Sequence, residues 1–533
     1  MLTLKPLSSL EKVFHDEAPA GEAFTGCSLL LGEEVSFQLA FCCDEDTELL
    51  PEITSPAAVR CYWVEEIPSA LPCYEDSDAD YLRKTPGLYP DLLRPVAGPK
   101  RIRAGEWHSL WLTLRCDEAT QSPLRVEIAL QNARAAFTFT QIPQALPAQR
   151  LLCTNWFHCD CIAQAHGLEP FCGEYWAILE NYIRCAAEHG INFLLTPLFT
   201  PPLDTAPGGE RLTSQLVGVR LEGGRYAFDF TLLGRWFALC GACGIRAFEL
   251  SHLFTQWGAQ HAPKIMAHVD GEYRLLFGWE TDADSAEYTD FLTQLAAALL
   301  PFLEEQGVKD RCYVHVSDEP GMKDFDTYAR HAALIKSLFP GLPMIDALSD
   351  FAFYQKGLIE RPIPANNHVE AFISRVPELW TYYCCGQHKD GVANRFFAMP
   401  SYRNRVLGLQ LWKFRCAGFL QWGYNFWNSV YSRRPIDPFT CSDAEGSFPS
   451  GDAYVVYPGE NGQPLCSLRL KVFHEALQDV RALQLLESSI GYEAALALVE
   501  EGLDAPLTFS QYPRSAAWLL GVRERINKAL INA

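Results

Sequence analysis

The sequence lacks several features that define common classes of protein. No apolar run reaches the roughly 18 residues that a membrane-spanning helix needs, so we expect no membrane partner. The Gly-x-Ser-x-Gly turn that presents a serine nucleophile in α/β-hydrolases does not occur. The glycine patterns of dinucleotide-binding and phosphate-binding loops are missing as well. These absences argue against a serine hydrolase and against a nucleotide-dependent enzyme, and we expect no cofactor.

Positive charge is also scarce. The 533 residues include 44 Lys and Arg against 65 Asp and Glu, which gives a net charge of −21 at pH 7. Such a chain repels the phosphates of nucleic acids and of anionic membrane surfaces, so a nucleic-acid partner is not expected. A neutral or cationic substrate fits this charge better. The hydrophobic content of 48% is typical of a globular protein with a sizeable core.

The N-terminus lacks the basic segment and apolar core of a secretory signal. The 19 cysteines are an odd number, and free thiols at this density are tolerated in a reducing compartment. We therefore expect a cytoplasmic protein without a disulfide network. The pair Cys159-x-Cys161 has no second cysteine pair at zinc-ribbon spacing, so structural zinc is not expected there. The oligomeric state stays open, and a homo-oligomer is possible.

Residues 1–147 consist of short segments in which apolar and polar residues alternate. Examples are Val35–Phe41, Ser109–Leu114 and Leu124–Leu130, with turn residues between them. A period of two predicts strands with one buried face, and a helical pattern is scarcely present here. This region is therefore predicted to be an N-terminal antiparallel β-sandwich.

From residue 148 to residue 455 apolar strands alternate with amphipathic helices. Tyr175–Glu188, for example, carries its apolar side chains on one helical face, and Gly190 follows as a typical C-terminal cap. This alternation predicts an α/β fold with a (β/α)8 TIM-like barrel; an open doubly wound sheet is the alternative. Residues 456–533 are predicted to form a helical C-terminal extension packed on the barrel. The eight candidate strands are Leu151–Phe157, Ile191–Pro197, Ile245–Ser251, Cys312–Ser317, Met344–Leu348, Val369–Ile373, Leu379–Cys384 and Phe419–Tyr424.

Two adjacent carboxylates, Asp318 and Glu319, follow the fourth of these strands. Pro320 disfavours a helical conformation at Glu319, so the pair is expected on a strand-to-loop corner, where α/β barrels keep their catalytic groups. Two carboxyls this close cannot ionise independently, because one charge raises the pKa of the other. One acid and one base are what glycosidic bond cleavage requires. The same pair could instead cap a helix.

Polar and aromatic side chains follow the other strands too. Planar rings cover the apolar face of a sugar while amides and carboxylates bind its hydroxyls, so this mixture indicates a carbohydrate site. A rival interpretation makes His158, Asp160, His252, His315 and Asp318 metal ligands, but a tight His-x-His or His-x-x-x-His pair is missing and no metal is expected. The predicted substrate-binding residues are His158, Asp204, Glu249, His252, Trp257, His315, Tyr382, Trp422 and Asn425.

Six segments of the chain resemble glycoside hydrolase family 123. The resemblance runs in order from about residue 150 to about residue 485. It implies a substrate-assisted retaining hydrolase that removes terminal β-linked N-acetylgalactosamine, or a related 2-acetamido sugar, from an oligosaccharide or glycoside. The segments are Val314–Pro320, Trp380–Cys385, Gly418–Trp427, Gly451–Tyr454, Tyr457–Gly459 and Ser467–Leu470.

The resemblance also implies roles for single residues. Glu319 would be the general acid, and Asp318 would orient the 2-acetamido group and stabilise an oxazolinium intermediate. The carbonyl oxygen of the substrate would then be the nucleophile. Tyr382 is expected to bind the acetamido oxygen, and Trp422 is expected to line its pocket.

Two alternatives stay open. In the first, the protein is a glycosidase for a sugar without an acetamido group, and Glu249 or Asp204 is the nucleophile or base. In the second, it is a non-catalytic carbohydrate-binding protein in which Asp318 and Glu319 cap a helix. The galacto or gluco preference, the anomer and exo or endo action are left open by the sequence.

Overall fold

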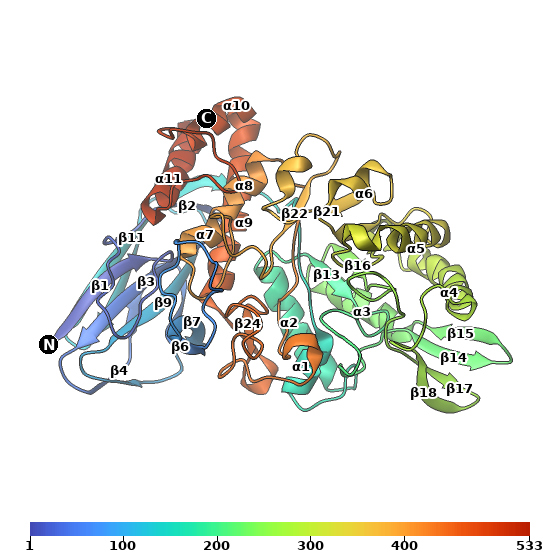
Figure 1. The fold of residues 1–533 in the computed structure, drawn as a ribbon. Coiled ribbons are helices and arrows are strands. Elements are labelled where there is room, and N and C mark those ends of the chain that lie inside the picture. The colour runs from blue at the N-terminus through green and yellow to red at the C-terminus, as the bar shows by residue number, and fades with distance from the viewer. Residues whose placement is uncertain (210, 533) are drawn as a thin grey trace.

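The structure is a computed structural model that describes residues 1–209 and 211–532 (Figure 1). It is a mixed α/β protein, with antiparallel sheets near the N-terminus, a parallel sheet with helices in the middle and helices at the C-terminus. No helix in the described part of the chain is long and apolar enough to span a bilayer. All 19 cysteines are free thiols.

Two sheets face each other in the N-terminal region, and their strands explain the alternating pattern of the sequence. The buried faces meet in one apolar core, where the ring of Phe37 lies 4.5 Å from that of Phe137 and 4.9 Å from that of Phe139. The first sheet has the order β1 (Leu2–Ser8), β3 (Glu34–Cys43), β9 (Trp107–Arg115), β6 (Ala58–Ser69) and β7 (Gly87–Pro95). The second has the order β2 (Ser28–Leu31), β11 (Ala133–Ala145), β10 (Leu124–Leu130) and β5 (Glu52–Thr54), beside the short pair β4 (Thr47–Leu49) and β8 (Lys100–Ile102).

Six parallel strands form the sheet that carries the candidate site. Their order is β19 (Cys312–Val314), β16 (Ala247–Leu250), β13 (Phe193–Thr196), β12 (Leu152–Asn155), β23 (Gly418–Gln421) and β22 (Trp380–Tyr382). A separate parallel pair, β20 (Ile345–Ala347) and β21 (Arg361–Ile363), meets the two edges of this sheet through single bridges, Val314–Met344 and Ala365–Tyr382. The described strands therefore make a parallel half-barrel sheet plus a pair, and the complete barrel stays a prediction.

The sixth predicted strand is wrong. Val369–Ile373 begins with a 3-10 turn, and the strand at this point of the chain is β21. Proline cannot donate to a strand ladder, so Pro362 hid this strand from the sequence pattern. Val369 and Phe372 are apolar for another reason, because they are buried in a small separate core. Each of the other seven candidate segments overlaps an observed strand.

Helices cover the parallel sheet, and a four-stranded mixed sheet that the sequence pattern did not indicate projects beside it (Figure 1). α2 (Tyr175–Glu188) has the bounds that its apolar face predicted. The other helices are α1 (Cys159–Ala165), α3 (Thr231–Ala242), α4 (Ala286–Glu305), α5 (Phe325–Leu338), α6 (Phe351–Gln355), α7 (Ser401–Arg405) and α8 (Leu407–Lys413). The projecting sheet has the order β15 (Arg225–Asp229), β14 (Gly218–Glu222), β17 (Ile265–Val269) and β18 (Glu272–Phe277).

The C-terminal helices lie between the sandwich and the parallel sheet (Figure 1). In α9 (Leu468–Ile490), Lys471 pairs with Glu34 of β3 at 3.0 Å, while the same helix packs on α7 and α8. In α11 (Ala516–Asn532), Arg523 pairs with Glu33 at 2.7 Å. The tail therefore contacts both halves of the molecule, and the domain limits at residues 147 and 455 stay a prediction. The remaining elements are β24 (Val456–Pro458), β25 (Pro464–Cys466) and α10 (Tyr492–Val499).

Candidate active site

The carboxylate pair lies on a strained corner just beyond β19. Glu319 has a φ of 46°, in the left-handed region that costs a non-glycine residue free energy. Two backbone hydrogen bonds hold the corner: the N–H of Glu319 donates to the carbonyl of Ala347 at 3.0 Å, and that of Trp257 donates to the carbonyl of Asp318 at 3.0 Å. The corner is therefore fixed by the end of β20 on one side and by the Trp257 loop on the other.

A cleft of about 550 Å³ opens at this corner. Two further lining residues, Asp204 (φ 44°) and Trp257 (φ 56°), also have left-handed backbones. Strain of this kind concentrates at functional sites, because it holds side chains in directions that a relaxed chain would not adopt. The cleft is lined by Trp156, Leu203, Asp204, Gln256, Trp257, Asp318, Glu319, Ala347, Tyr382, Cys384, Cys385, Leu420, Trp422 and Phe448.

The two carboxyls of the pair differ in environment. Asp318 is buried, and this burial, together with the charges of Glu319 and Asp346, raises the pKa of Asp318 well above its usual range. Glu319 is exposed to the cleft, and its Oε1 accepts a hydrogen bond of 2.5 Å from the hydroxyl of Tyr382. Burial raises the pKa of Tyr382 well above its usual range, so the phenol stays a donor. The pair can therefore hold one proton where a proton can be passed to a ligand.

Behind the pair, His315 lies between two fully buried carboxylates. Its Nδ1 is 3.1 Å from Oδ1 of Asp346, and its Nε2 is 3.0 Å from Oε2 of Glu249. Burial lowers the pKa of His315, but the hydrogen bonds to Asp346 and Glu249 outweigh it and bring this pKa to about 9. Oε2 of Glu249 also accepts from the indole of Trp156 at 2.9 Å. The imidazole of His315 therefore links the ends of three strands, β19, β16 and β20.

The rival set of metal ligands does not come together. His158 and Asp160 both contact the guanidinium of Arg211. Nδ1 of His158 lies 2.9 Å from it, and Oδ1 of Asp160 lies 2.5 Å from it. His252 stacks on His315 with ring centroids 4.1 Å apart, and with Asp346 these rings are close enough to share an ion. Both nitrogens of His315 already face carboxylates, Nδ1 that of Asp346 and Nε2 that of Glu249.

His158 and Asn425 fix the end of β23. The backbone N–H of His158 donates to Oδ1 of Asn425 at 2.9 Å, and Nδ2 of Asn425 donates to the carbonyl of His158 at 3.0 Å. Burial, and then the charge of Arg211, lower the pKa of His158 to about 3. The neutral ring donates from Nε2 to the carbonyl of Trp422 at 2.9 Å. These contacts hold the strand end from which Trp422 enters the cleft.

The structure thus divides the predicted site residues into two groups. Those that line the cleft are Asp204, Trp257, Asp318, Glu319, Tyr382 and Trp422. Those that lie in the walls behind it are His158, Glu249, His252, His315 and Asn425. Their roles toward a substrate stay predictions.

Sequence reasoning missed Asp452, which fixes Trp422. Oδ2 of Asp452 accepts from Nε1 of Trp422 at 2.8 Å, and burial raises the pKa of Asp452 to about 7. Asp452 stands in the Gly451–Tyr454 segment that resembles family 123. The resemblance therefore marked this position but gave the residue no role. Asp346 was missed too, although it lies in a predicted strand. Further lining residues that were not predicted are Trp156, Gln256, Cys384 and Cys385.

Comparisons with known proteins agree with this geometry. The family profile described as "Glycoside hydrolase 123, catalytic domain" matches residues 156–486. A solved family 123 glycoside hydrolase from Clostridium perfringens has a TM-score of 0.74 at 14% identity, covering 100% of this chain and 98% of its own. A family 5 mannosidase from Rhizomucor miehei is much less similar, with a TM-score of 0.35 at 11% identity, covering 62% of this chain and 94% of its own. The search of curated proteins finds no match. Because the family profile spans more than half of the 533 residues, the protein belongs to glycoside hydrolase family 123.

Proposed function

We propose that this glycoside hydrolase removes a β-linked N-acetylgalactosamine, or a related 2-acetamido sugar, by substrate-assisted retaining catalysis. The observation that carries the proposal is the Asp318–Glu319 corner, which presents both carboxyls to one aromatic-lined cleft. The C. perfringens enzyme is described as acting in glycolipid glycan hydrolysis, which supports a glycan as the substrate class here.

In the first step the carbonyl oxygen of the 2-acetamido group attacks the anomeric carbon. The bond to the leaving oxygen breaks, and Glu319 gives its proton to that oxygen. The resulting oxazolinium ring is positively charged, and Asp318 stabilises it by accepting a hydrogen bond from its N–H. The positive charge of this ring in turn favours the ionised form of Asp318.

In the second step water attacks the anomeric carbon and opens the oxazolinium ring. Glu319, now ionised, takes a proton from this water, which restores the starting state and retains the anomeric configuration. Tyr382 reaches Glu319 at 2.5 Å, and it would turn toward the acetamido oxygen when a sugar enters. Trp257 and Trp422 would cover the apolar faces of the sugar.

A panel of nitrophenyl glycosides tests the proposal. β-N-Acetylgalactosaminide and β-N-acetylglucosaminide should be cleaved with retention, while the corresponding β-galactoside and β-glucoside, which lack the acetamido group, should resist. A thiazoline that mimics the oxazoline should inhibit competitively. Asp318→Asn should impair substrates with good and poor leaving groups alike, because it acts on acetamido participation. Cleavage of the plain galactoside at a similar rate would contradict substrate assistance.

A glycosidase with a second protein carboxylate is the other candidate, and Asp204 favours it. This residue lines the same cleft in a strained conformation, and burial raises its pKa to about 6. Glu249 is less suited, since it is fully buried and bound to Trp156 and His315. Trapping a covalent sugar on Asp204, detected by peptide mass spectrometry, would establish this mechanism in place of the first.

We also propose that the parallel strands complete a (β/α)8 barrel. The pair β20–β21 stands between the two edge strands of the six-stranded sheet, and the single bridges Val314–Met344 and Ala365–Tyr382 lie at these edges. Such an arrangement supports a barrel in which the cleft occupies the C-terminal end of the strands.

A further inference from the structure

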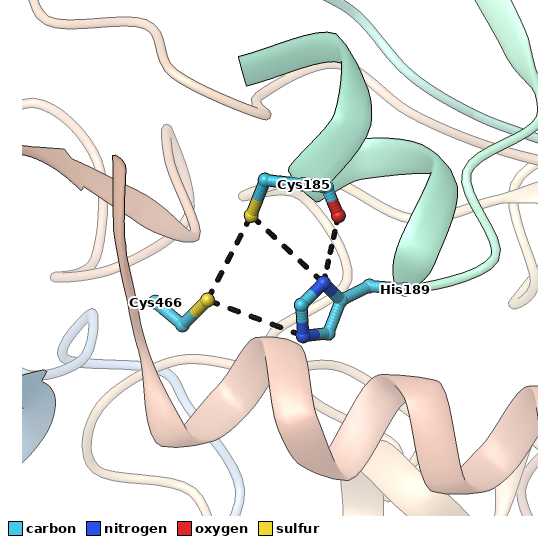
Figure 2. Close-up of side chains that lie close together, drawn as sticks. All are labelled: Cys185, His189 and Cys466. Carbon is cyan, nitrogen blue, oxygen red and sulfur yellow. Dashed lines mark hydrogen bonds between the residues drawn. The ribbon is translucent and has the colours of Figure 1, made fainter. Parts of the chain in front are cut away.

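Away from the cleft, two thiols and an imidazole gather between α2 and the start of α9 (Figure 2). Cys185 and His189 stand one helical turn apart at the end of α2, and Cys466 ends β25. The Sγ atoms of Cys185 and Cys466 are 3.7 Å apart. Nδ1 of His189 lies 3.9 Å from Sγ of Cys185, and its Nε2 lies 4.0 Å from Sγ of Cys466. Figure 2 shows all three side chains pointing toward one another.

These separations fit a shared metal ion better than a disulfide. A disulfide places its sulfurs about 2.05 Å apart, far closer than the 3.7 Å found here. A tetrahedral zinc with Zn–S of about 2.3 Å and Zn–N of about 2.0–2.1 Å places its ligand atoms about 3.6–3.8 Å from each other. The two sulfurs stand at that spacing, and Nε2 of His189 lies 4.0 Å from Sγ of Cys466. One ligand atom from each of the three residues lies within 4.8 Å of the others.

The imidazole of His189 is held in the tautomer that a metal ligand needs. Its Nδ1 lies 2.7 Å from the carbonyl oxygen of Cys185, so Nδ1 carries the proton and donates it. Nε2, which faces Cys466, is then left with its lone pair. A hydrogen bond from the second ring nitrogen to a backbone carbonyl is the usual arrangement around metal-bound histidines.

A further imidazole with an unpartnered nitrogen lies beside this cluster. The ring of His474, on α9, lies 5.6 Å from the ring of His189, and its Nδ1 is buried without a hydrogen-bond partner. An unpartnered buried nitrogen costs free energy unless something binds it. The nearby cation Lys471 is already paired with Glu34 at 3.0 Å, so it is not free to neutralise two thiolates.

We propose that Cys185, His189 and Cys466 bind a zinc ion, with His474 or a water molecule in the fourth position. On binding, each thiol loses its proton to the solvent, and the two thiolates balance the charge of the ion. His189 lies just before β13, at the end of the parallel strands opposite the cleft. The metal would therefore be structural, joining α2 to a segment 281 residues away in the sequence.

Metal analysis of the full-length protein, purified under reducing conditions, tests this site. Elemental mass spectrometry should find one zinc ion per chain. Cys185→Ser and Cys466→Ser should each lose the zinc. The control is Cys243→Ser, which changes a half-buried cysteine at the end of α3 and should keep the zinc. Zinc at full occupancy in both site variants would overturn the proposal, as would a wild-type protein that neither contains zinc nor takes it up.

Measurements on the unmutated chain keep the test valid if a variant fails to fold. Co²⁺ added to the reduced, metal-free protein should give the thiolate charge-transfer bands of a tetrahedral site. Alkylation should spare Cys185 and Cys466 until a chelator is added, and chelation should lower Tm while kcat stays unchanged. A Cys185–Cys466 disulfide in the native protein, or full alkylation of both thiols with zinc present, would overturn the proposal.

Discussion

Two regions of the molecule bury carboxylates, and they treat them in opposite ways. Where the sandwich meets the C-terminal helices, carboxylates face arginines: Asp91 is bound by Arg469 at 2.7 and 2.9 Å, and Asp479 by Arg405 at 2.8 Å. In the cleft, Asp318 faces Glu319 instead. None of the described residues that line the cleft is Lys or Arg.

The difference separates stability from chemistry. An arginine beside a buried carboxylate keeps it ionised and leaves it no proton to give, so the pair only joins two parts of the chain. A carboxyl without a cation keeps its proton to higher pH, at a cost in free energy that a binding partner can recover. The junction is therefore expected to control folding, and the cleft is expected to control turnover.

The largest effect is expected in the cleft. Glu319→Gln removes the proposed general acid, so kcat/KM on substrates with poor leaving groups should fall about 10²–10⁴-fold. Activated nitrophenyl glycosides should suffer much less, because a phenolate leaves with little protonation. Tm should scarcely change, since Glu319 is exposed. Measuring kcat/KM on an alkyl and on a nitrophenyl glycoside checks this prediction. The control variant is Glu45→Gln, which changes an exposed residue. Equal losses on both substrates would contradict the prediction.

The matching change at the junction should affect stability instead. Arg469→Met leaves Asp91 buried without its cation, which typically costs about 3–5 kcal/mol of unfolding free energy. Denaturant unfolding measures this cost, and the surviving folded protein should keep its kcat. The control is Arg101→Met, whose side chain is 76% exposed in its pair with Asp46 and should contribute under about 1 kcal/mol. Similar losses in the two variants would remove the distinction between junction and surface.

The position of the carboxylate corner could be predicted because its signal is local: Asp318 and Glu319 are adjacent and follow an apolar strand. The His315 network was not predictable in the same way, since Glu249 lies 66 residues and Asp346 31 residues from the histidine. A chain pattern cannot show which distant carboxylates share one ring. Arg469 stood in a recognised segment, yet its partner Asp91 is 378 residues away.

The same argument explains the errors in the fold. Seven strands could be predicted because their segments are mainly apolar, carry no proline within the observed strand and are bounded by helices or turns. β21 could not, because Pro362 breaks the pattern while its pairing with β20 supplies the missing stability. The projecting sheet of β14, β15, β17 and β18 was missed since its strands expose polar residues on much of their surface.

Asp452 combines features of both regions, because it is buried near arginines and yet has a raised pKa. It should therefore make the stability of the protein depend on pH. Its pKa is about 7 in the folded state and about 3.9 when unfolded, so the unfolded chain releases this proton first as pH rises. The contribution of Asp452 to the free energy of unfolding should therefore fall by about 3 kcal/mol as the pH rises from 4 to 7. Asp452→Asn keeps an oxygen for Trp422 and should flatten that part of the curve, whereas the exposed Asp504→Asn should not. Parallel curves for wild type and Asp452→Asn, from urea unfolding at several pH values, would refute this.

The smallest effect is expected from the hydroxyl that holds Glu319. Tyr382→Phe removes the hydroxyl that binds Glu319 at 2.5 Å and that is proposed to turn to the acetamido oxygen when a sugar enters. One neutral hydrogen bond is worth about 0.5–1.5 kcal/mol, so kcat should fall about two- to tenfold. The adjacent Tyr383 is an internal control, because its hydroxyl is buried without a hydrogen-bond partner. Tyr383→Phe should leave kcat unchanged and should keep or slightly raise Tm, since no bond is lost. Comparing kcat, KM and Tm of the two variants separates the effect of the Tyr382 hydroxyl from that of general packing. A similar loss of kcat in both would show that the cleft depends on packing here and not on that hydroxyl.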